Sequence, residues 1–283
     1  MAGMSSGVFK LLINMTQKLP PSWRLALAQS PKAAWLRRLS QVSDGDGDAV
    51  VELSAPLAGY RMRLSMRAGH RRFALGTYEP DVCAVIQSHR HGETMMDIGA
   101  NVGYFTLLMA QHAGRDGQVI AFEPVPGVHA LLCENLRLNN CTQARAERMA
   151  LADVESSETM YSERDSPVPF TARLADDGDC RVTVGTVDRY VEAAGMKKLD
   201  FVKIDVEGAE DRVIRGMTRT LRTFRPDILV EIHRDDGTPS EALERLHEMG
   251  YELSRLGRNG QTPCGTRAEG GHVAAVWRAP ASR

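Results

Sequence analysis

Three polar residues in the second half of the chain carry side chains that can move a proton or hold a divalent metal ion. Asp205 and Glu207 stand two residues apart in "KIDVEG", and His233 closes "VEIH". An ordinary histidine pKa lies near neutrality, so His233 suits a general base that takes a proton from an alcohol. We predict Asp205, Glu207 and His233 as catalytic residues; a histidine merely hydrogen-bonded at a strand end is the alternative.

The same three residues are also candidate metal ligands. Carboxylates and imidazole bind divalent ions, and a metal there would hold two hydroxyls of an acceptor. Their spacing, however, matches no standard ligand motif. We therefore favour metal-free chemistry at Asp205, Glu207 and His233.

A glycine turn in "MMDIGANVGYFT" (95–106) is typical of a site for a nucleotide-like cofactor. The dinucleotide fingerprint GxGxxG that begins at Gly99 would need two more glycines, but Asn101 and Tyr104 stand there. The GK[ST] ending of a phosphate-binding loop is absent as well. S-adenosylmethionine (SAM) needs a close backbone turn without a phosphate cradle, so the loop favours SAM. Asp97 would then meet the cationic methionine end.

Further acids follow the next strands. Glu123 ends "AFE", where a carboxylate has two oxygens for the two ribose hydroxyls. Asp153 follows the third strand, near the expected adenine, and Tyr78 and Glu79 could close over the cofactor. Taken singly, each acid could be a helix cap or a surface residue. The predicted cofactor-binding residues are Tyr78, Glu79, Asp97, Gly99, Ala100, Asn101, Glu123, Pro124, Ala152, Asp153 and Asp205.

The elements that must position these residues are strands alternating with helices after residue 94. Strands are expected at 94–99, 117–124, 146–151, 199–208 and 226–233, and two closing strands at 251–256 and 272–277. Helices are expected at 104–113, 127–138, 209–224 and 240–249, and a short hairpin or loop between 156 and 188. This order predicts a doubly wound, mostly parallel α/β sheet, in which ligands bind at the carboxyl ends of the strands.

The N-terminal quarter reads as a separate appendage over residues 1–75, before a cofactor-binding domain over 76–283. Residues 60–67 alternate between apolar and polar, which predicts a half-buried strand paired with 50–53, its arginine face in solvent. The first 43 residues carry six Lys or Arg and no acid. This basic, partly helical arm could rest on a membrane surface, but packing on its own domain or on a second copy is favoured. Packing on a second copy would give a homo-oligomer through this arm.

Composition narrows the function classes. The formal net charge of −1 gives no general attraction to nucleic acid. Five cysteines without CxxC spacing support neither a zinc site nor a disulfide framework. No apolar run reaches the roughly 20 residues that span a bilayer, and no secretory signal is recognisable. We expect a cytoplasmic protein that does not bind nucleic acid.

Several stretches resemble FkbM-family methyltransferases, which are class I SAM-dependent enzymes. They are "TYEP", "MMDIGANVGYFTLLMA", "GQVIAFEPVPGVHALLCENLRLNN", "TVDRY", "LDFVKIDVEGAEDRVIRGM" and "PDILVEIH". The resemblance implies a Rossmann-like, seven-stranded sheet with an antiparallel last strand. It also implies methyl transfer to a hydroxyl of a small molecule, often a natural product or a sugar.

Two other functions remain open from the sequence. The chain could methylate a macromolecule, or it could bind SAM without catalysis. The reading "DVEG" after the fourth strand, where N-methyltransferases typically have [ND]PP[YF], argues against adenine and amide acceptors.

Overall fold

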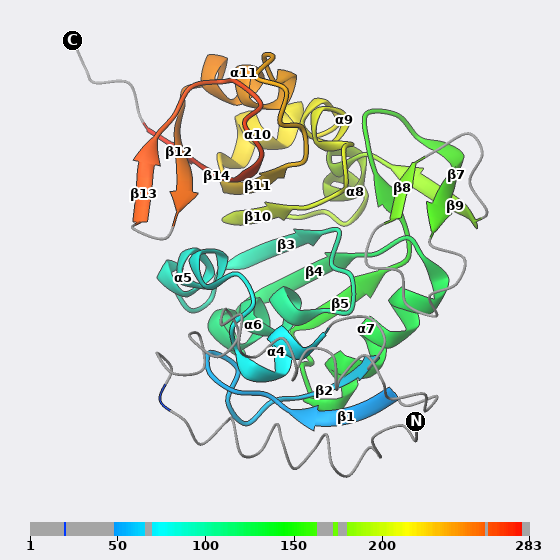
Figure 1. Cartoon of the computed structure of the whole chain (residues 1–283). Coiled ribbons are helices and arrows are strands. Elements are labelled where there is room, and N and C mark those ends of the chain that lie inside the picture. The colour runs from blue at the N-terminus through cyan, green and yellow to red at the C-terminus, as the bar shows by residue number, and fades with distance from the viewer. Residues whose placement is uncertain are drawn as a thin grey trace, which may run out of the picture.

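The computed structural model describes Pro20 and residues 48–65, 70–162, 172–174, 180–257 and 260–278. Among them, eight strands form one main sheet in the order β13-β12-β14-β11-β10-β3-β4-β5 (Figure 1). The strands are β3 (Thr94–Ile98), β4 (Gln118–Phe122), β5 (Ala144–Glu147), β10 (Phe201–Ile204), β11 (Asp227–Ile232), β12 (Tyr251–Gly257), β13 (Gly260–Pro263) and β14 (Gly271–Trp277). The doubly wound, mostly parallel sheet is confirmed: β14 is antiparallel to both neighbours, and β13 adds a short edge strand to the seven expected.

Helices cover both faces of this sheet because its strands have apolar side chains on both faces. One set packs with α5 (Pro80–Ser88), α6 (Tyr104–Ala113) and α7 (Pro126–Leu138). The other set packs with α8 (Val187–Ala193), α9 (Glu210–Arg215), α10 (Thr218–Phe224) and α11 (Glu241–Glu248). The change of face falls between neighbouring residues such as Met95 and Met96, as the two-residue period of a strand requires. No helix in the described part of the chain has the length and apolar character needed to cross a membrane.

Two expected elements are each divided in the structure. The third strand, predicted at 146–151, is β5 in the main sheet and β6 (Ala150–Leu151) in a second sheet. The helix predicted over 209–224 breaks at Gly216 into α9 and α10. A Cβ on Gly216 would lie 1.8 Å from the Ala152 carbonyl oxygen, and the Gly216 carbonyl accepts from the Asp188 amide. The close approach to the chain after β6 therefore interrupts the helix.

The second sheet occupies the region expected to be a hairpin or loop. Its strands are β6, β7 (Ser156–Ser162), β8 (Ala172–Leu174) and β9 (Cys180–Gly185), in the order β6-β9-β7-β8. β7 and β9 pair antiparallel, which agrees with the expected hairpin, whereas β6 runs parallel to β9. Figure 1 shows this sheet beside the main one, next to α8.

The predicted N-terminal hairpin is present as β1 (Asp48–Glu52) paired antiparallel with β2 (Arg61–Ser65). Met62 and Leu64 are buried in the core shared with α6 and α7, while Arg61 is exposed and Arg63 pairs with Glu134 on α7. The division of the chain at residue 75 stays a prediction. The basic arm over 1–43 and its predicted helices lie outside the described residues.

An asparagine fastens this hairpin to the main sheet's helical layer. Asn135 is fully buried on α7; its Oδ1 accepts from the Arg63 amide at 2.7 Å, and its Nδ2 donates to the Val102 carbonyl at 2.8 Å. One side chain thus links the hairpin to the glycine turn after β3. Asn139, which caps the C-terminal end of α7, makes a matching pair of bonds with the Arg61 backbone.

We expect Asn135→Ala to lower the free energy of unfolding by about 2–4 kcal/mol, because it leaves the buried Val102 carbonyl and the half-buried Arg63 amide without this partner. Asn139→Ala is the matched comparison: its site is less buried, so water can replace the lost bonds and the effect is smaller. Chemical denaturation of both variants measures the difference. Equal losses would contradict the role given to Asn135.

Candidate active site

A cavity of about 220 Å³ opens at the carboxyl ends of β3, β4, β10 and β11. Ten of the predicted site residues line it: Tyr78, Glu79, Gly99, Ala100, Asn101, Glu123, Pro124, Asp205, Glu207 and His233. The two predicted halves, cofactor loop and catalytic residues, therefore face one space. A parallel sheet produces this because its strand ends meet at one edge.

The glycine turn fits between β4 and β10 with no room for a side chain. A Cβ on Gly99, whose φ is +83°, would lie 1.8 Å from the Asp205 carbonyl oxygen. The Gly99 and Ala100 amides both donate to the Phe122 carbonyl at the end of β4. Asn101 follows with a left-handed φ of 49°. The turn is thereby held between the loops that carry Glu123 and Asp205.

Glu123 presents a buried carboxylate to the cavity beside this turn. Its two oxygens accept from the Asn101 and Val125 amides at 3.0 and 2.9 Å. Burial raises the pKa of Glu123 to about 7, against the lowering effect of these two amides. Each carboxylate oxygen has a second lone pair, so two hydroxyl donors on neighbouring carbons fit this group.

A buried lysine lies between the predicted cofactor-binding residue Asp97 and the predicted catalytic residue Asp205. Lys203, only 2% exposed, lies 3.1 Å from Asp205 and 3.8 Å from Asp97, each distance from Nζ to a carboxylate oxygen. Burial alone would lower the pKa of Lys203, but the two carboxylates raise it above its usual value. Burial alone would raise the pKa of Asp205, but the Lys203 ammonium holds that pKa below its usual value. Lys203 is therefore an ammonium and Asp205 a carboxylate.

Asp97 lies beneath the cavity rather than in its lining. It is fully buried, and its Oδ2 accepts from the Thr106 hydroxyl at 2.6 Å. Burial raises its pKa, which Lys203 and Thr106 oppose. A bond from Asp97 to a cofactor stays a prediction.

Ala152 and Asp153 are not among the lining residues. Ala152 is buried below the second sheet. The Asp153 carboxylate pairs with Arg212 and Arg215 on α9 at 2.9 and 3.0 Å. It thus ties the chain after β6 to α9, and its contact with adenine stays a prediction.

His233 is held from two sides at the catalytic end. Its Nδ1 lies 2.7 Å from Glu210, a buried residue of α9, and its Nε2 lies 3.6 Å from Asp205 and 3.4 Å from Glu207. Burial alone would lower the pKa of His233, but the bond to Glu210 and the nearby carboxylates raise it to about 9. Because Nδ1–H donates a hydrogen bond to the Glu210 carboxylate, Nε2 is the nitrogen that exchanges a proton with the cavity.

Three polar residues around the cavity were not predicted: Glu210, Glu231 and His272. Glu210 stands in "DVEGAE", three residues after Glu207, and Glu231 alternates with His233 on β11, so both had a spacing signal. His272 begins β14 and pairs with Glu231 across the strands. Its position depends on β14 entering the sheet beside β11, which no local pattern shows. Among the described residues, two groups could hold a metal: Glu79, Glu231 and His272, and Asp205, Glu231 and His233.

Comparison with known families now decides the class. The model of the methyltransferase FkbM domain matches residues 97–253, more than half of the chain. The chain belongs to the FkbM methyltransferase family. The matched range runs from Asp97 in β3 to β12, so it includes the glycine turn, Glu123, Lys203 and His233. Glu79 and His272 lie outside it.

Three curated relatives show how far the similarity extends. The chain is 24% identical over 195 residues to methyltransferase 1 of Beauveria bassiana, covering 62% of this chain and 78% of the relative. It is 26% identical over 221 residues to hexuronic acid methyltransferase AglP of Haloferax volcanii, covering 75% and 88%. It is 27% identical over 196 residues to 31-O-demethyl-FK506 methyltransferase FkbM of Streptomyces tacrolimicus, covering 58% and 74%.

We expect Glu123→Gln to weaken the binding of S-adenosylhomocysteine by roughly tenfold to a hundredfold. The reason is that the ribose hydroxyls would lose their hydrogen bonds to a charged carboxylate. Isothermal titration calorimetry measures the change. Glu248→Gln, at an exposed position on α11, is the control and should bind like the parent chain. Unchanged affinity of Glu123→Gln would exclude the carboxylate from the cofactor site.

Proposed function

We propose that this FkbM-family chain transfers a methyl group from SAM to a hydroxyl of a small molecule. The observation that carries the proposal is the imidazole of His233, fixed by Glu210 on the wall of the cavity that also contains the glycine turn. Relatives named for a hexuronic acid and for FK506 support a small hydroxylated acceptor. The acceptor itself is a natural product or a sugar moiety in this proposal.

The residues at the cofactor end fit SAM. The glycine turn has no pyrophosphate cradle, and the buried Glu123 carboxylate beside it has lone pairs for two ribose hydroxyls. The cavity's acids, Asp205 and Glu207 among them, suit a molecule with positive charge. When bound, SAM supplies an electrophilic methyl group on its sulfonium.

At the catalytic end, His233 removes the acceptor's hydroxyl proton at Nε2 in this proposal. Glu210 holds the ring in place and stabilises the imidazolium that results. Asp205 and Glu207 lie 3.6 and 3.4 Å from the same nitrogen and further stabilise that charge. The protein must also hold the acceptor oxygen, the methyl carbon and the sulfur in line. Because the donor is already reactive, this positioning contributes much of the rate gain.

The proposal is tested by methyl transfer from labelled SAM into metabolite extracts, followed by mass spectrometry. We expect label in a small molecule, and His233→Gln to lower the rate by about 10²–10⁴-fold while leaving S-adenosylhomocysteine affinity unchanged. His247→Gln, exposed on α11, is the matched control.

Each contrary result has its own meaning. Label only in protein or RNA would exclude the small-molecule acceptor. Absence of S-adenosylhomocysteine binding would exclude the cofactor, and full activity of His233→Gln would exclude the base.

A pH profile tests the base separately. A raised histidine pKa means that His233 is protonated below about 9, so the neutral, proton-accepting form grows as the pH rises through that value. We expect kcat/KM to rise tenfold per pH unit and to level off near pH 9. Glu210→Gln removes a neighbouring negative charge, so the same rise should occur at lower pH, with a lower plateau. A flat profile would contradict a base of raised pKa.

A further inference from the structure

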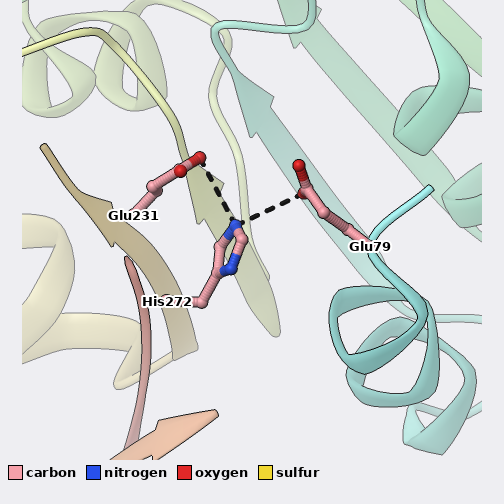
Figure 2. Close-up of side chains that lie close together, drawn as sticks. All are labelled: Glu79, Glu231 and His272. Atoms are coloured by element: carbon pink, nitrogen blue, oxygen red, sulfur yellow. Dashed lines mark ion pairs between the residues drawn. The ribbon is translucent and has the colours of Figure 1, made fainter. Parts of the chain in front are cut away.

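Three side chains from separate parts of the chain converge beside the cavity, and none belongs to the His233–Glu210 pair. Glu79 precedes α5, Glu231 lies on β11 and His272 lies on β14. Figure 2 shows both carboxylates directed at the same ring nitrogen of His272. Glu231 and His272 are direct cross-strand partners, and Glu79 reaches them from the helical layer above.

The distances in this cluster do not fit good hydrogen bonds. His272 Nε2 lies 3.3 Å from an oxygen of Glu79 and 3.3 Å from an oxygen of Glu231. A charge-assisted N–H···O bond is usually about 2.7–2.9 Å long, and an N–H shared between two carboxylates makes only long, poorly aligned bonds to both. Within the described residues, His272 Nε2 and Glu79 Oε2 are both buried atoms with no hydrogen-bond partner.

The same distances fit ligands of one ion. Ligand atoms about 2.0–2.2 Å from a metal lie roughly 3–3.5 Å apart in tetrahedral or octahedral geometry. All three candidate ligand atoms here lie within 4.8 Å of one another. Buried polar atoms that converge without bonding each other are the arrangement that a central cation satisfies.

The neighbouring group of three is a weaker candidate for a cation. In it, Asp205 is already paired with the Lys203 ammonium at 3.1 Å, and His233 is engaged by Glu210 at 2.7 Å. Among the described residues, Glu79 and Glu231 each form an ion pair with His272, and neither is paired with a lysine or an arginine. Burial alone would lower the pKa of His272 and the carboxylates raise it, yet one imidazolium can offset only one of the two negative charges in this outer cluster.

We propose that Glu79, Glu231 and His272 bind one divalent transition-metal ion, Mn²⁺ or Zn²⁺, at the wall of the cavity. One imidazole with two carboxylates favours these ions over Mg²⁺ and Ca²⁺, which take oxygen ligands only. Glu79 and Glu231 also line the cavity, so the ion's remaining positions face the space that receives the acceptor. A role in holding acceptor hydroxyl oxygens rests on the function proposed above, whereas ion binding does not.

The test is metal binding by the full chain, stripped with chelator and without SAM or acceptor. MnCl₂ is titrated in and free Mn²⁺ is followed by electron paramagnetic resonance; ZnCl₂ is measured by mass spectrometry of the metal after gel filtration. We expect one equivalent per chain. His272→Ala and Glu79→Gln should each weaken binding by at least about tenfold, since even residues that only support metal ligands matter by that much.

Two histidine variants make the result specific. His247→Ala, exposed on α11, should bind metal like the parent chain, and so should His233→Ala. Loss of binding in His233→Ala with retention in His272→Ala would move the ion to the inner group and overturn the proposal. Absence of Mn²⁺ and Zn²⁺ binding by the parent chain would overturn it too. Glu79→Gln keeps the size of the side chain, and its melting temperature shows whether a loss reflects unfolding.

Metal binding and methyl transfer are read separately. Binding of one equivalent without any transfer from SAM would leave the ion site standing and count against the proposed function. Transfer that proceeds in His272→Ala with metal binding abolished would restrict the ion to a role outside catalysis.

Discussion

The buried ammonium of Lys203 is the constraint on which the centre of this structure depends. A charge removed from water at the middle of a sheet costs several kcal/mol unless opposite charges meet it. Asp97 on β3 is its direct neighbour across the strands, and Asp205 follows β10 by one residue. Removing the lysine would leave two carboxylates buried together. The pairing fixes where the Asp205 carboxylate stands, and with it the position of the loop against which Gly99 packs.

On the same face of the sheet as Lys203, polar residues follow on the neighbouring strands: Glu231 on β11 and His272 on β14. The face is apolar further back, at Met95, Phe201 and Leu229, and becomes charged only toward the carboxyl ends of the strands. Stability and chemistry are thus divided along the length of the same strands. Left-handed backbone at Glu79, Asn101 and Glu207, with φ of 37°, 49° and 52°, adds strain of about 1–3 kcal/mol each at the cavity wall. The apolar part of the sheet has to supply that energy.

Sequence patterns predicted the strands and helices of the main sheet and many of the residues that line the cavity. Strands buried on both faces and a helix such as 104–113, which agrees with α6 at both ends, follow from local apolar periodicity. Acids at strand ends were found because parallel strands bring their carboxyl ends together. The break at Gly216 was missed because it arises from contact with Ala152, distant along the chain. His272 was missed for a related reason: strand order, and not any motif, places it beside Glu231.

The insertion of β14 between β11 and β12 makes the main sheet extend beyond the range shared with the family. Residues 97–253 contain the whole range shared with the FkbM methyltransferase domain, yet a fragment cut to those limits would lose β14. Strand β12 would then lack the neighbour that connects it to β11. The range shared with the family therefore ends inside the main sheet, whose last strand extends to Trp277.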